Sequence, residues 1–469
     1  GKLKKVAVTG GPAQTICDAP SGFDASWSTD GVIAFDGGGS DPILRVSAAG
    51  GVASVAVPTD SGGVGWPEFL PDGRHMLYLR LRSSGAHEVW VADLRSDKRR
   101  LLGTAGSRVE YSPAGYLLYV KDRTLVAQPF DARALRFEGE PMPVVDGIGT
   151  GGNGQAHFSV SDQGALVYTS AGLAGSAQLV WVNRSGLRLS QVGAAGDILN
   201  LTLAPDGKRV AVRTLDGQTA NRDIWILDPD RGTSTRFTFD SSNENTPLWS
   251  PDGHWIAFSS DRSTGISNLF RKPSGGAGAE ESLLVSPNMK LLTHWSRDGR
   301  YIAYQERHPA TSVDQWALPL FGDRKPFPVV QTPFIEGHGR ISPDGRWIAY
   351  SSDESGRFEV YVQTFPGAGG KWQISSRGGF QPTWRADGRE LYYLGLDGGM
   401  MAVSIAAEAG FAAGVPAALF NTRIPLSTAI AQYVPAADGQ RFLIIAPEGD
   451  AGLTPLTVVL HWHRELQDR

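Results

Sequence analysis

Apolar and polar positions along this chain form a pattern that recurs ten times. In each copy an apolar or aromatic residue leads into a tight turn that ends in glycine, and an apolar strand follows. The clearest copies are WSPDGHWIAF at 249–258, WSRDGRYIAY at 295–304 and ISPDGRWIAY at 341–350. The turn glycines lie 42 to 51 residues apart and are Gly31, Gly73, Gly115, Gly164, Gly207, Gly253, Gly299, Gly345, Gly388 and Gly439. One hairpin in each period of this length predicts the blades of a β-propeller.

The residue types at the turn explain why a hairpin forms there. Pro251 presets φ, Asp252 can bond local backbone amides, and Gly253 accepts the conformation that closes the loop. The strand after the turn is apolar on both faces, and a second hairpin follows it, so we predict an all-β fold of four-stranded antiparallel blades. We assign a structural turn role to Asp72, Gly73, Asp206, Gly207, Asp252, Gly253, Asp298, Gly299, Asp344, Gly345, Asp387 and Gly388.

The grouping of the blades depends on one irregular stretch. Residues 169–177, Thr-Ser-Ala-Gly-Leu-Ala-Gly-Ser-Ala, are the most linker-like part of the chain. We therefore predict two rings, the first over 1–170 with about four repeats and an opening hairpin, and the second, six-bladed, over 171–469. One large ring is the alternative. The chain opens in mid-pattern, so we expect the first region to lack its beginning.

Strands at the two ends of the second region must pair with strands from elsewhere in the chain. Gln178 to Gly193 reads as one outer hairpin, with six full turn hairpins after it. The closing stretch 456–462 reads as a third strand without an evident fourth. Its partner comes either from near the N-terminus or from mid-chain, because an open edge would leave backbone groups unpaired.

Composition and charge narrow the function classes. The 58 glycines and 29 prolines are spread as one turn cluster per hairpin, which argues against disorder. The net charge of -4 has no basic stripe behind it, so we expect no nucleic acid partner. Cys17 is the only cysteine, which excludes an intrachain disulfide. No apolar run reaches about 18 residues, so we expect no membrane segment in this chain.

Catalytic and metal motifs are missing from the sequence. There is no Gly-x-Ser-x-Gly elbow and no kinase catalytic loop, so we expect neither enzyme activity nor a cofactor. His461 and His463 point to one strand face but lack a third ligand, so no metal site is predicted. Asp261 and Asp353 miss the spacing of a calcium loop and are interpreted as turn formers.

Candidate binding residues follow from strand geometry. In a propeller the innermost strand leads into the turn, so residues four and six before the turn aspartate alternate onto one face. Polar groups that converge there can form a ligand or peptide site, although a water-filled channel also tolerates them. The ligand-binding candidates in the last six repeats are Asn200, Thr246, His294, His338, Arg340, Gln381 and Gln432.

The repeat, Trp/Ile-Ser-Pro-Asp-Gly-Arg-Trp-Ile-Ala-Tyr-Ser-Ser-Asp, resembles TolB-type propeller repeats over almost the whole chain. More narrowly, residues 67–75, 353–366 and 455–462 resemble the region C-terminal to the membrane span in certain bacterial Ser/Thr protein kinases. That resemblance implies an extracytoplasmic sensor, on the periplasmic or extracellular side, that binds a protein, a peptide or a small ligand. The alternatives are a free periplasmic TolB-like interaction scaffold and the propeller of a split prolyl-oligopeptidase-like hydrolase.

Overall fold

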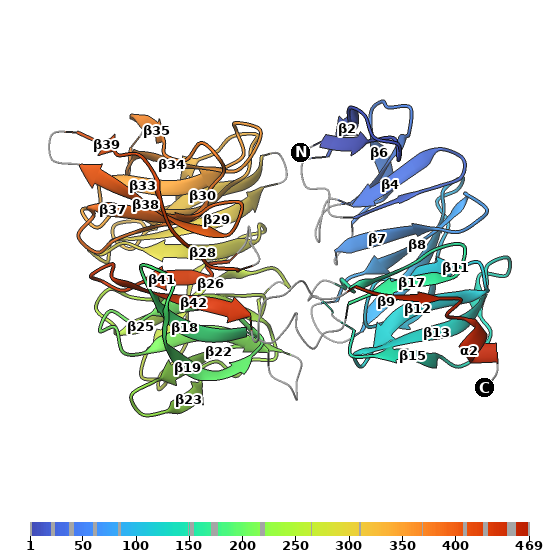
Figure 1. The fold of residues 1–469 in the computed structure, drawn as a ribbon, viewed down its shortest axis with the longest axis horizontal. Helices are drawn as coiled ribbons and strands as arrows, with labels where there is room; N and C mark the ends of the chain where they lie inside the picture. Colours follow the sequence, from blue (N-terminus) through green and yellow to red (C-terminus); the bar gives the residue numbers. More distant parts are fainter. Residues whose placement is uncertain are drawn as a thin grey trace. The chain divides into compact units, whose positions relative to one another are not determined.

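The chain forms two compact β-sheet units (Figure 1). The computed structural model describes residues 2–19, 24–36, 42–59, 63–82, 86–148, 150, 154–169, 177–215, 221–263, 265–308, 311–367, 369–406, 410–424, 430–447 and 456–467. Unit 1 comprises Gly1–Gly175 and Gly452–Arg469, and unit 2 comprises Ser176–Ala451. A four-residue helix, α2 (Arg464–Gln467), follows the last strand. Within the described ranges no helix is both long enough and apolar enough to span a membrane.

The described part of unit 2 contains 25 strands in six sheets. They are β18 (Ala177–Asn183), β19 (Arg188–Gly196), β20 (Ile198–Leu203), β21 (Val210–Leu215), β22 (Arg222–Asp228), β23 (Thr233–Arg236), β24 (Glu244–Trp249), β25 (Trp255–Ser260), β26 (Asn268–Pro273), β27 (Glu281–Leu284), β28 (Lys290–Trp295), β29 (Tyr301–His308), β30 (Ser312–Pro319), β31 (Phe327–Val330), β32 (Glu336–Ile341), β33 (Trp347–Ser352), β34 (Glu359–Thr364), β35 (Lys371–Gln373), β36 (Phe380–Trp384), β37 (Glu390–Leu394), β38 (Gly399–Ala406), β39 (Ala412–Ala413), β40 (Ala417–Asn421), β41 (Tyr433–Pro435) and β42 (Arg441–Pro447).

These sheets are the six blades of a closed propeller. Five blades are built from consecutive strands, such as β24-β25-β26-β27 and β32-β33-β34-β35. The sixth has the order β19-β18-β42-β41, so the hairpin at 178–193 supplies its two outer strands. Val180 of β18 lies opposite Ile444 of β42 in an antiparallel ladder. Pairing the first and last strands of the unit closes the ring and satisfies both edges.

Unit 1 is built from consecutive blades of the same kind. Three sheets have four or five strands, a two-stranded sheet precedes them, and a three-stranded sheet, β16-β17-β43, follows. The strands are β1 (Lys2–Lys5), β2 (Gln14–Asp18), β3 (Ala25–Trp27), β4 (Val32–Asp36), β5 (Ile43–Ser47), β6 (Ser54–Val57), β7 (Val64–Phe69), β8 (His75–Arg80), β9 (His87–Asp93), β10 (Arg99–Ala105), β11 (Glu110–Ser112), β12 (Tyr116–Lys121), β13 (Thr124–Asp131), β14 (Arg136–Phe137), β15 (Met142–Asp146), β16 (Phe158–Val160), β17 (Ala165–Tyr168) and β43 (Thr457–Leu460).

Strand β43 changes the expected domain boundary. The sequence predicts a second propeller over 171–469, but Val459 of β43 lies opposite Leu166 of β17, in unit 1. The partner of the closing strand therefore comes from mid-chain, and residues 452–469 belong with the first unit. The predicted linker falls mainly on residues 170–176, which lie outside the described residues.

The hydrophobic core lies between neighbouring blades. Ile256, Ala257 and Phe258, the residues after the turn at 253, are all 0% exposed. Phe258 packs toward Phe237 of the preceding blade, whereas Ala257 packs toward Tyr304 of the following one. The strand is thus sandwiched on both faces, which explains why its sequence is continuously apolar.

The turn at 342–347 has the geometry that its residue types require. The Ser342 hydroxyl donates to Asp344 Oδ1 over 2.6 Å and accepts from the Trp347 amide over 3.0 Å. The Gly345 amide donates to the Ser342 carbonyl over 2.9 Å. Gly345 has a φ of 72°, and the other nine turn glycines also have positive φ. The Asp-Gly pair therefore closes the hairpin through local bonds and a left-handed backbone.

We expect Gly345→Val to lower the free energy of unfolding by more than about 1 kcal/mol, because a β-branched residue is strained at positive φ. An added Cβ would meet no atom within 4 Å, so backbone strain and not a clash is the cause. Urea denaturation measures the change. Gly275→Val is the control, since that position is equally open without a positive φ. Equal stability of both variants would contradict the turn assignment.

Candidate functional site

The innermost strands of unit 2 surround a narrow axial cavity. Its volume is about 20 Å³, which is room for one or two water molecules. It is lined by Asn200, Leu201, Thr246, Pro247, Leu248, Leu292, Thr293, His338, Arg340 and Ala431. Four of these, Asn200, Thr246, Leu292 and His338, lie six residues before a turn aspartate. Equivalent positions of successive blades thus converge at one place.

A bulge in five of the six innermost strands that the structure describes, β20, β24, β28, β32 and β36, shapes this lining. The ladder between β32 and β33 shifts between Gly337 and Arg340, and His338 has a φ of 59°. Thr246 and Gln381 have φ values of 46° and 53° at the equivalent positions. A bulge re-aims a side chain out of the regular alternation, and positive φ is costly for residues other than glycine. The backbone nearest the cavity is therefore strained.

Side chains of the preceding blade hold the strained residues in place. The His338 amide donates to Gln305 Oε1 over 3.4 Å, and the Gln381 amide donates to Ser351 Oγ over 3.2 Å. Both acceptors lie on the second strand of the blade before. Such bonds fix a backbone conformation that would otherwise relax.

His338 has unmatched polar atoms, and Arg340 lines the cavity beside it. His338 is 6% exposed, and within the described part of the chain neither ring nitrogen has a hydrogen-bond partner. Burial, and then the charge of Arg340, lower the pKa of His338 to about 3, so the ring is neutral near pH 7. Burial lowers the pKa of Arg340 to about 10, which leaves the guanidinium charged.

The other predicted residues have different partners. His294 is not part of the cavity lining; its Nδ1 accepts from the Ile341 amide over 3.2 Å. Gln381 Nε2 donates to Gln432 Oε1 over 2.9 Å, and the Gln432 amide donates to Gln381 Oε1 over 2.9 Å. The structure therefore brings Asn200, Thr246, His338 and Arg340 to the cavity, while Gln381 and Gln432 join two blades.

Unit 1 has its own polar column, which the sequence analysis did not consider. Glu68 and Glu110 lie five residues before a turn glycine, the position that Arg340 has before Gly345. Glu68 Oε1 accepts from the Tyr111 amide over 3.3 Å. Burial, and then the charge of Glu110, raise the pKa of Glu68 to about 8. The strand rule used for the last six repeats would have found both acids if extended to the first four.

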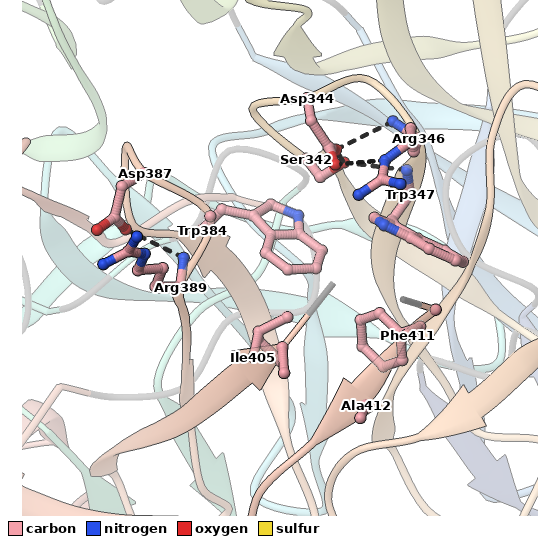
Figure 2. A pocket seen from close by; sticks show the side chains of 13 residues that line it. Ser342, Asp344, Arg346, Trp347, Trp384, Asp387, Arg389, Ile405, Phe411 and Ala412 are labelled. Carbon is pink, nitrogen blue, oxygen red and sulfur yellow. Dashed lines mark hydrogen bonds and ion pairs between the residues drawn. The ribbon is translucent and has the colours of Figure 1, made fainter. Parts of the chain in front are cut away.

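A larger pocket of about 810 Å³ lies between the blades β32–β35 and β36–β40 (Figure 2). The rings of Trp347, Trp384 and Phe411 face it, and an ion pair of Asp344 and Arg346, 2.7 Å long, lies at its edge. Aromatic walls of this kind suit an apolar or planar group. This pocket could not be predicted from the sequence, because blade packing alone accounts for aromatic residues in these strands.

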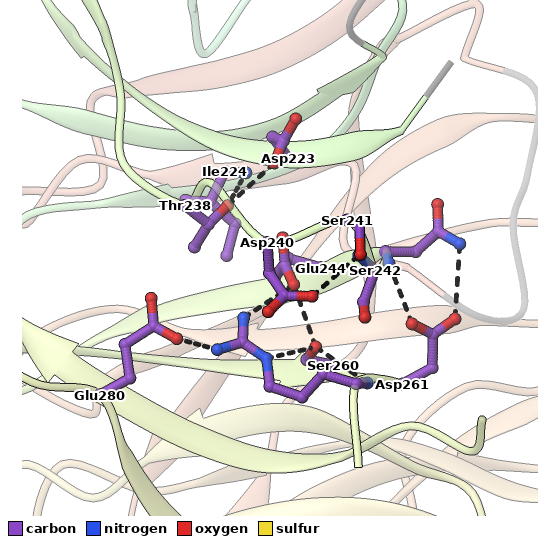
Figure 3. Close-up of polar contacts among 12 residues, drawn as sticks. Asp223, Ile224, Thr238, Asp240, Ser241, Ser242, Glu244, Ser260, Asp261 and Glu280 are labelled. Atoms are coloured by element: carbon purple, nitrogen blue, oxygen red, sulfur yellow. Dashed lines mark hydrogen bonds and ion pairs between the residues drawn. The ribbon is translucent and has the colours of Figure 1, made fainter. Parts of the chain in front are cut away.

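Carboxylates elsewhere in unit 2 link the first two strands, β24 and β25, of one blade (Figure 3). Glu244, 0% exposed, pairs with Arg262 over 2.8 Å and accepts from the Ser260 hydroxyl over 3.0 Å. Asp261, the predicted turn former, accepts from the Asn243 amide over 3.0 Å. Among the residues that the structure describes, no group of three or more His, Cys, Asp or Glu side chains is arranged to hold a metal ion.

Comparison with known proteins gives partial sequence matches. No protein-family model matches the chain. The uncharacterized peptidase YuxL of Bacillus subtilis is 34% identical over 105 residues, which is 21% of this chain and 16% of that protein. Tricorn protease homolog 1 of Streptomyces coelicolor is 31% identical over 120 residues, which is 25% of this chain and 11% of that protein. The chain thus matches less than a fifth of the length of either relative.

Solved structures similar to the chain include an Agrobacterium tumefaciens protein assigned as TolB. It has a TM-score of 0.46 and 17% identity, and the match covers 58% of this chain and 99% of that one. The sheet order described above makes the chain a β-propeller protein, and TolB is among its structural neighbours.

Proposed function

We propose that the chain is a non-catalytic binding protein whose six-bladed unit engages a protein or peptide at the axial cavity. The observation that carries this proposal is the imidazole of His338, buried with both ring nitrogens unmatched in the described structure, beside the partly buried Arg340 at the axial cavity. Most buried polar groups in folded proteins have hydrogen-bond partners. Groups without one that line a cavity are the groups that a ligand can satisfy.

The cellular setting that we propose is the extracytoplasmic side of a bacterial membrane, where the chain serves as the sensor region of a Ser/Thr kinase. The support is the resemblance of residues 67–75 and 353–366 to such regions. The coding region upstream of Gly1 tests this setting. A membrane span and a kinase domain would support it, whereas a signal peptide directly upstream would support a free periplasmic scaffold.

A second candidate is the propeller of a peptidase. It is favoured by the matches to YuxL and to Tricorn protease homolog 1, whose names denote peptide-cleaving proteins. In that case the propeller would admit peptides to a catalytic domain encoded beside it. A neighbouring domain with a Gly-x-Ser-x-Gly elbow would reveal this arrangement.

We expect His338→Ala combined with Arg340→Ala to weaken partner binding by at least about tenfold, since hydrogen bonds to charged groups contribute about 1.5–3 kcal/mol. Thermal unfolding should change little, because the two side chains have no hydrogen-bond or ion-pair partners in the described part of the chain. Selection of peptides from a displayed library, followed by calorimetry, measures the binding.

The matched control is His254→Ala combined with Arg346→Ala. Both side chains lie on turns, with 78% and 53% of their surface exposed. We expect these changes to leave binding unchanged. If the variant His338→Ala, Arg340→Ala also bound the partner normally, the two residues would only line the channel and the proposed binding site would be wrong.

A further inference from the structure

We infer that the group recognised at the axial cavity is a carboxylate, held by the guanidinium of Arg340 and the imidazole of His338. This inference rests on the proposed binding role of the cavity and names the chemistry of its ligand. It draws on four features of the cavity: its charge, its donors, its size and its rigidity.

The charge of Arg340 has no counterion within the described residues. The groups that it influences are His294, His338 and Tyr433, all neutral near pH 7. Two other partly buried arginines of unit 2 are paired, Arg262 with Glu244 over 2.8 Å and Arg184 with Glu390 over 2.9 Å. A buried cation without a partner is costly, and an anion in the cavity would offset that cost.

The donors around the cavity also favour an anion. A neutral imidazole retains one N–H, and His338 is buried with its ring nitrogens unmatched in the described structure. Asn200, 4% exposed, adds an amide to the same lining. None of the lining residues is acidic, so the site repels a cation and offers no carboxylate of its own.

The size of the cavity selects among anions. A volume of about 20 Å³ accommodates the two oxygens of a carboxylate, whereas a phosphate would need room for four. The planar fork of a guanidinium matches a carboxylate through two parallel hydrogen bonds. A carboxylate entering along the axis therefore fits both the space and the donor geometry.

The site is held in position before any ligand arrives. His338 is fixed at a φ of 59°, and the Gly339 amide next to it donates to Gln315 Oε1 over 2.9 Å. At the equivalent position of the preceding blade stands Leu292, which has no polar group. Donors fixed by the fold lose little freedom on binding, which favours a specific contact.

Acetate is the probe that tests this inference. We expect sodium acetate, titrated at pH 7 and constant ionic strength, to bind the full chain saturably and to shift the His338 ring nitrogens in NMR spectra. Arg340→Gln should weaken acetate binding by at least about tenfold, and Arg340→Lys should do so by less, since lysine keeps the charge but loses the fork. Arg346→Gln, an exposed arginine paired with Asp344, is the control and should change the affinity less than about twofold.

Three results would overturn the inference: no saturable acetate binding, equal binding by Arg340→Gln, or chloride binding as tight as acetate. Thermal unfolding of each variant confirms that it is folded. If acetate did not bind but the His338→Ala, Arg340→Ala variant still lost peptide binding, the carboxylate inference would be wrong and the proposed binding role would remain supported.

Two sources can supply the carboxylate, and peptides separate them. If a chain end is recognised, peptides with a free C-terminus bind and their amidated forms do not. If a small-molecule carboxylate is recognised, acetate binds and neither peptide form competes with it. Tight binding of an amidated peptide that displaces acetate poorly would contradict the carboxylate.

Discussion

Replacing Phe442 with alanine is expected to lower the free energy of unfolding of unit 2 by about 3–5 kcal/mol, the usual cost of removing a buried aromatic ring. Phe442 is 0% exposed and meets Tyr392 edge to face, with 5.0 Å between ring centroids. It lies opposite Val182 in the ladder between β42 and β18. The substitution therefore opens a cavity where the first and last strands of the ring meet.

Differential scanning calorimetry measures this change. Phe334→Ala is the matched control, because Phe334 is 42% exposed and the same atoms are removed. We expect that control to alter stability by no more than about 0.5 kcal/mol, as is usual for surface positions. If Phe442→Ala costs no more than Phe334→Ala, the β18–β42 pairing does not close the ring.

The blade architecture could be predicted from the sequence because its determinants are local. Asp344 and Gly345 specify the turn through bonds within six residues, and the strand that follows is apolar because it is covered on both faces. The hairpin at 178–193 could be predicted from the sequence for the same reason. Each of these features repeats, so one weak copy is corrected by the others.

The partner of β43 could not be predicted, because strand pairing between distant segments leaves no local trace. The stretch 456–462 has the apolar pattern of a strand, and that pattern suits any open edge. Its pairing with β17 depends on which edge unit 1 leaves free. The sequence therefore predicted the strand and left a mid-chain partner open, whereas the expected boundary at 171 placed the strand in the other unit.

The candidate site could be predicted only in part, because the bulges in the innermost strands depend on contacts between blades. Strand alternation placed His338 and Arg340 near the channel, and both line the cavity. It also selected His294, but in that blade Leu292 lines the cavity and His294 bonds to the Ile341 backbone. The bulges shift the register by an amount that depends on the neighbouring blade, so alternation alone cannot tell which of two polar residues reaches the cavity.

A strong pH dependence of stability is expected from Glu68 in unit 1. Burial and the neighbouring charge of Glu110 raise the pKa of Glu68 to about 8, while Arg108 acts in the opposite direction. Because the pKa is higher in the folded than in the unfolded chain, the folded state holds the proton between about pH 4.5 and 8. The stabilisation that this proton gives is complete below the unfolded pKa and is lost as the pH rises through about 8.

Glu68→Gln should remove this dependence, because glutamine mimics the neutral acid and can still accept from the Tyr111 amide. Relative to the unmodified chain, the variant should gain about 3 kcal/mol in free energy of unfolding between pH 6 and pH 9, since Glu68 stays protonated over about two pH units of this range and each unit corresponds to about 1.4 kcal/mol. Denaturant unfolding across this range measures the gain, and hydrogen exchange of the Tyr111 amide localises it to unit 1. Glu138→Gln, at an exposed position of the same unit, should follow the unmodified chain. If the free energy of unfolding of Glu68→Gln and of the unmodified chain changed in parallel with pH, Glu68 would be ionised in the folded state. A buried carboxylate that stays ionised needs a cationic partner to offset its desolvation.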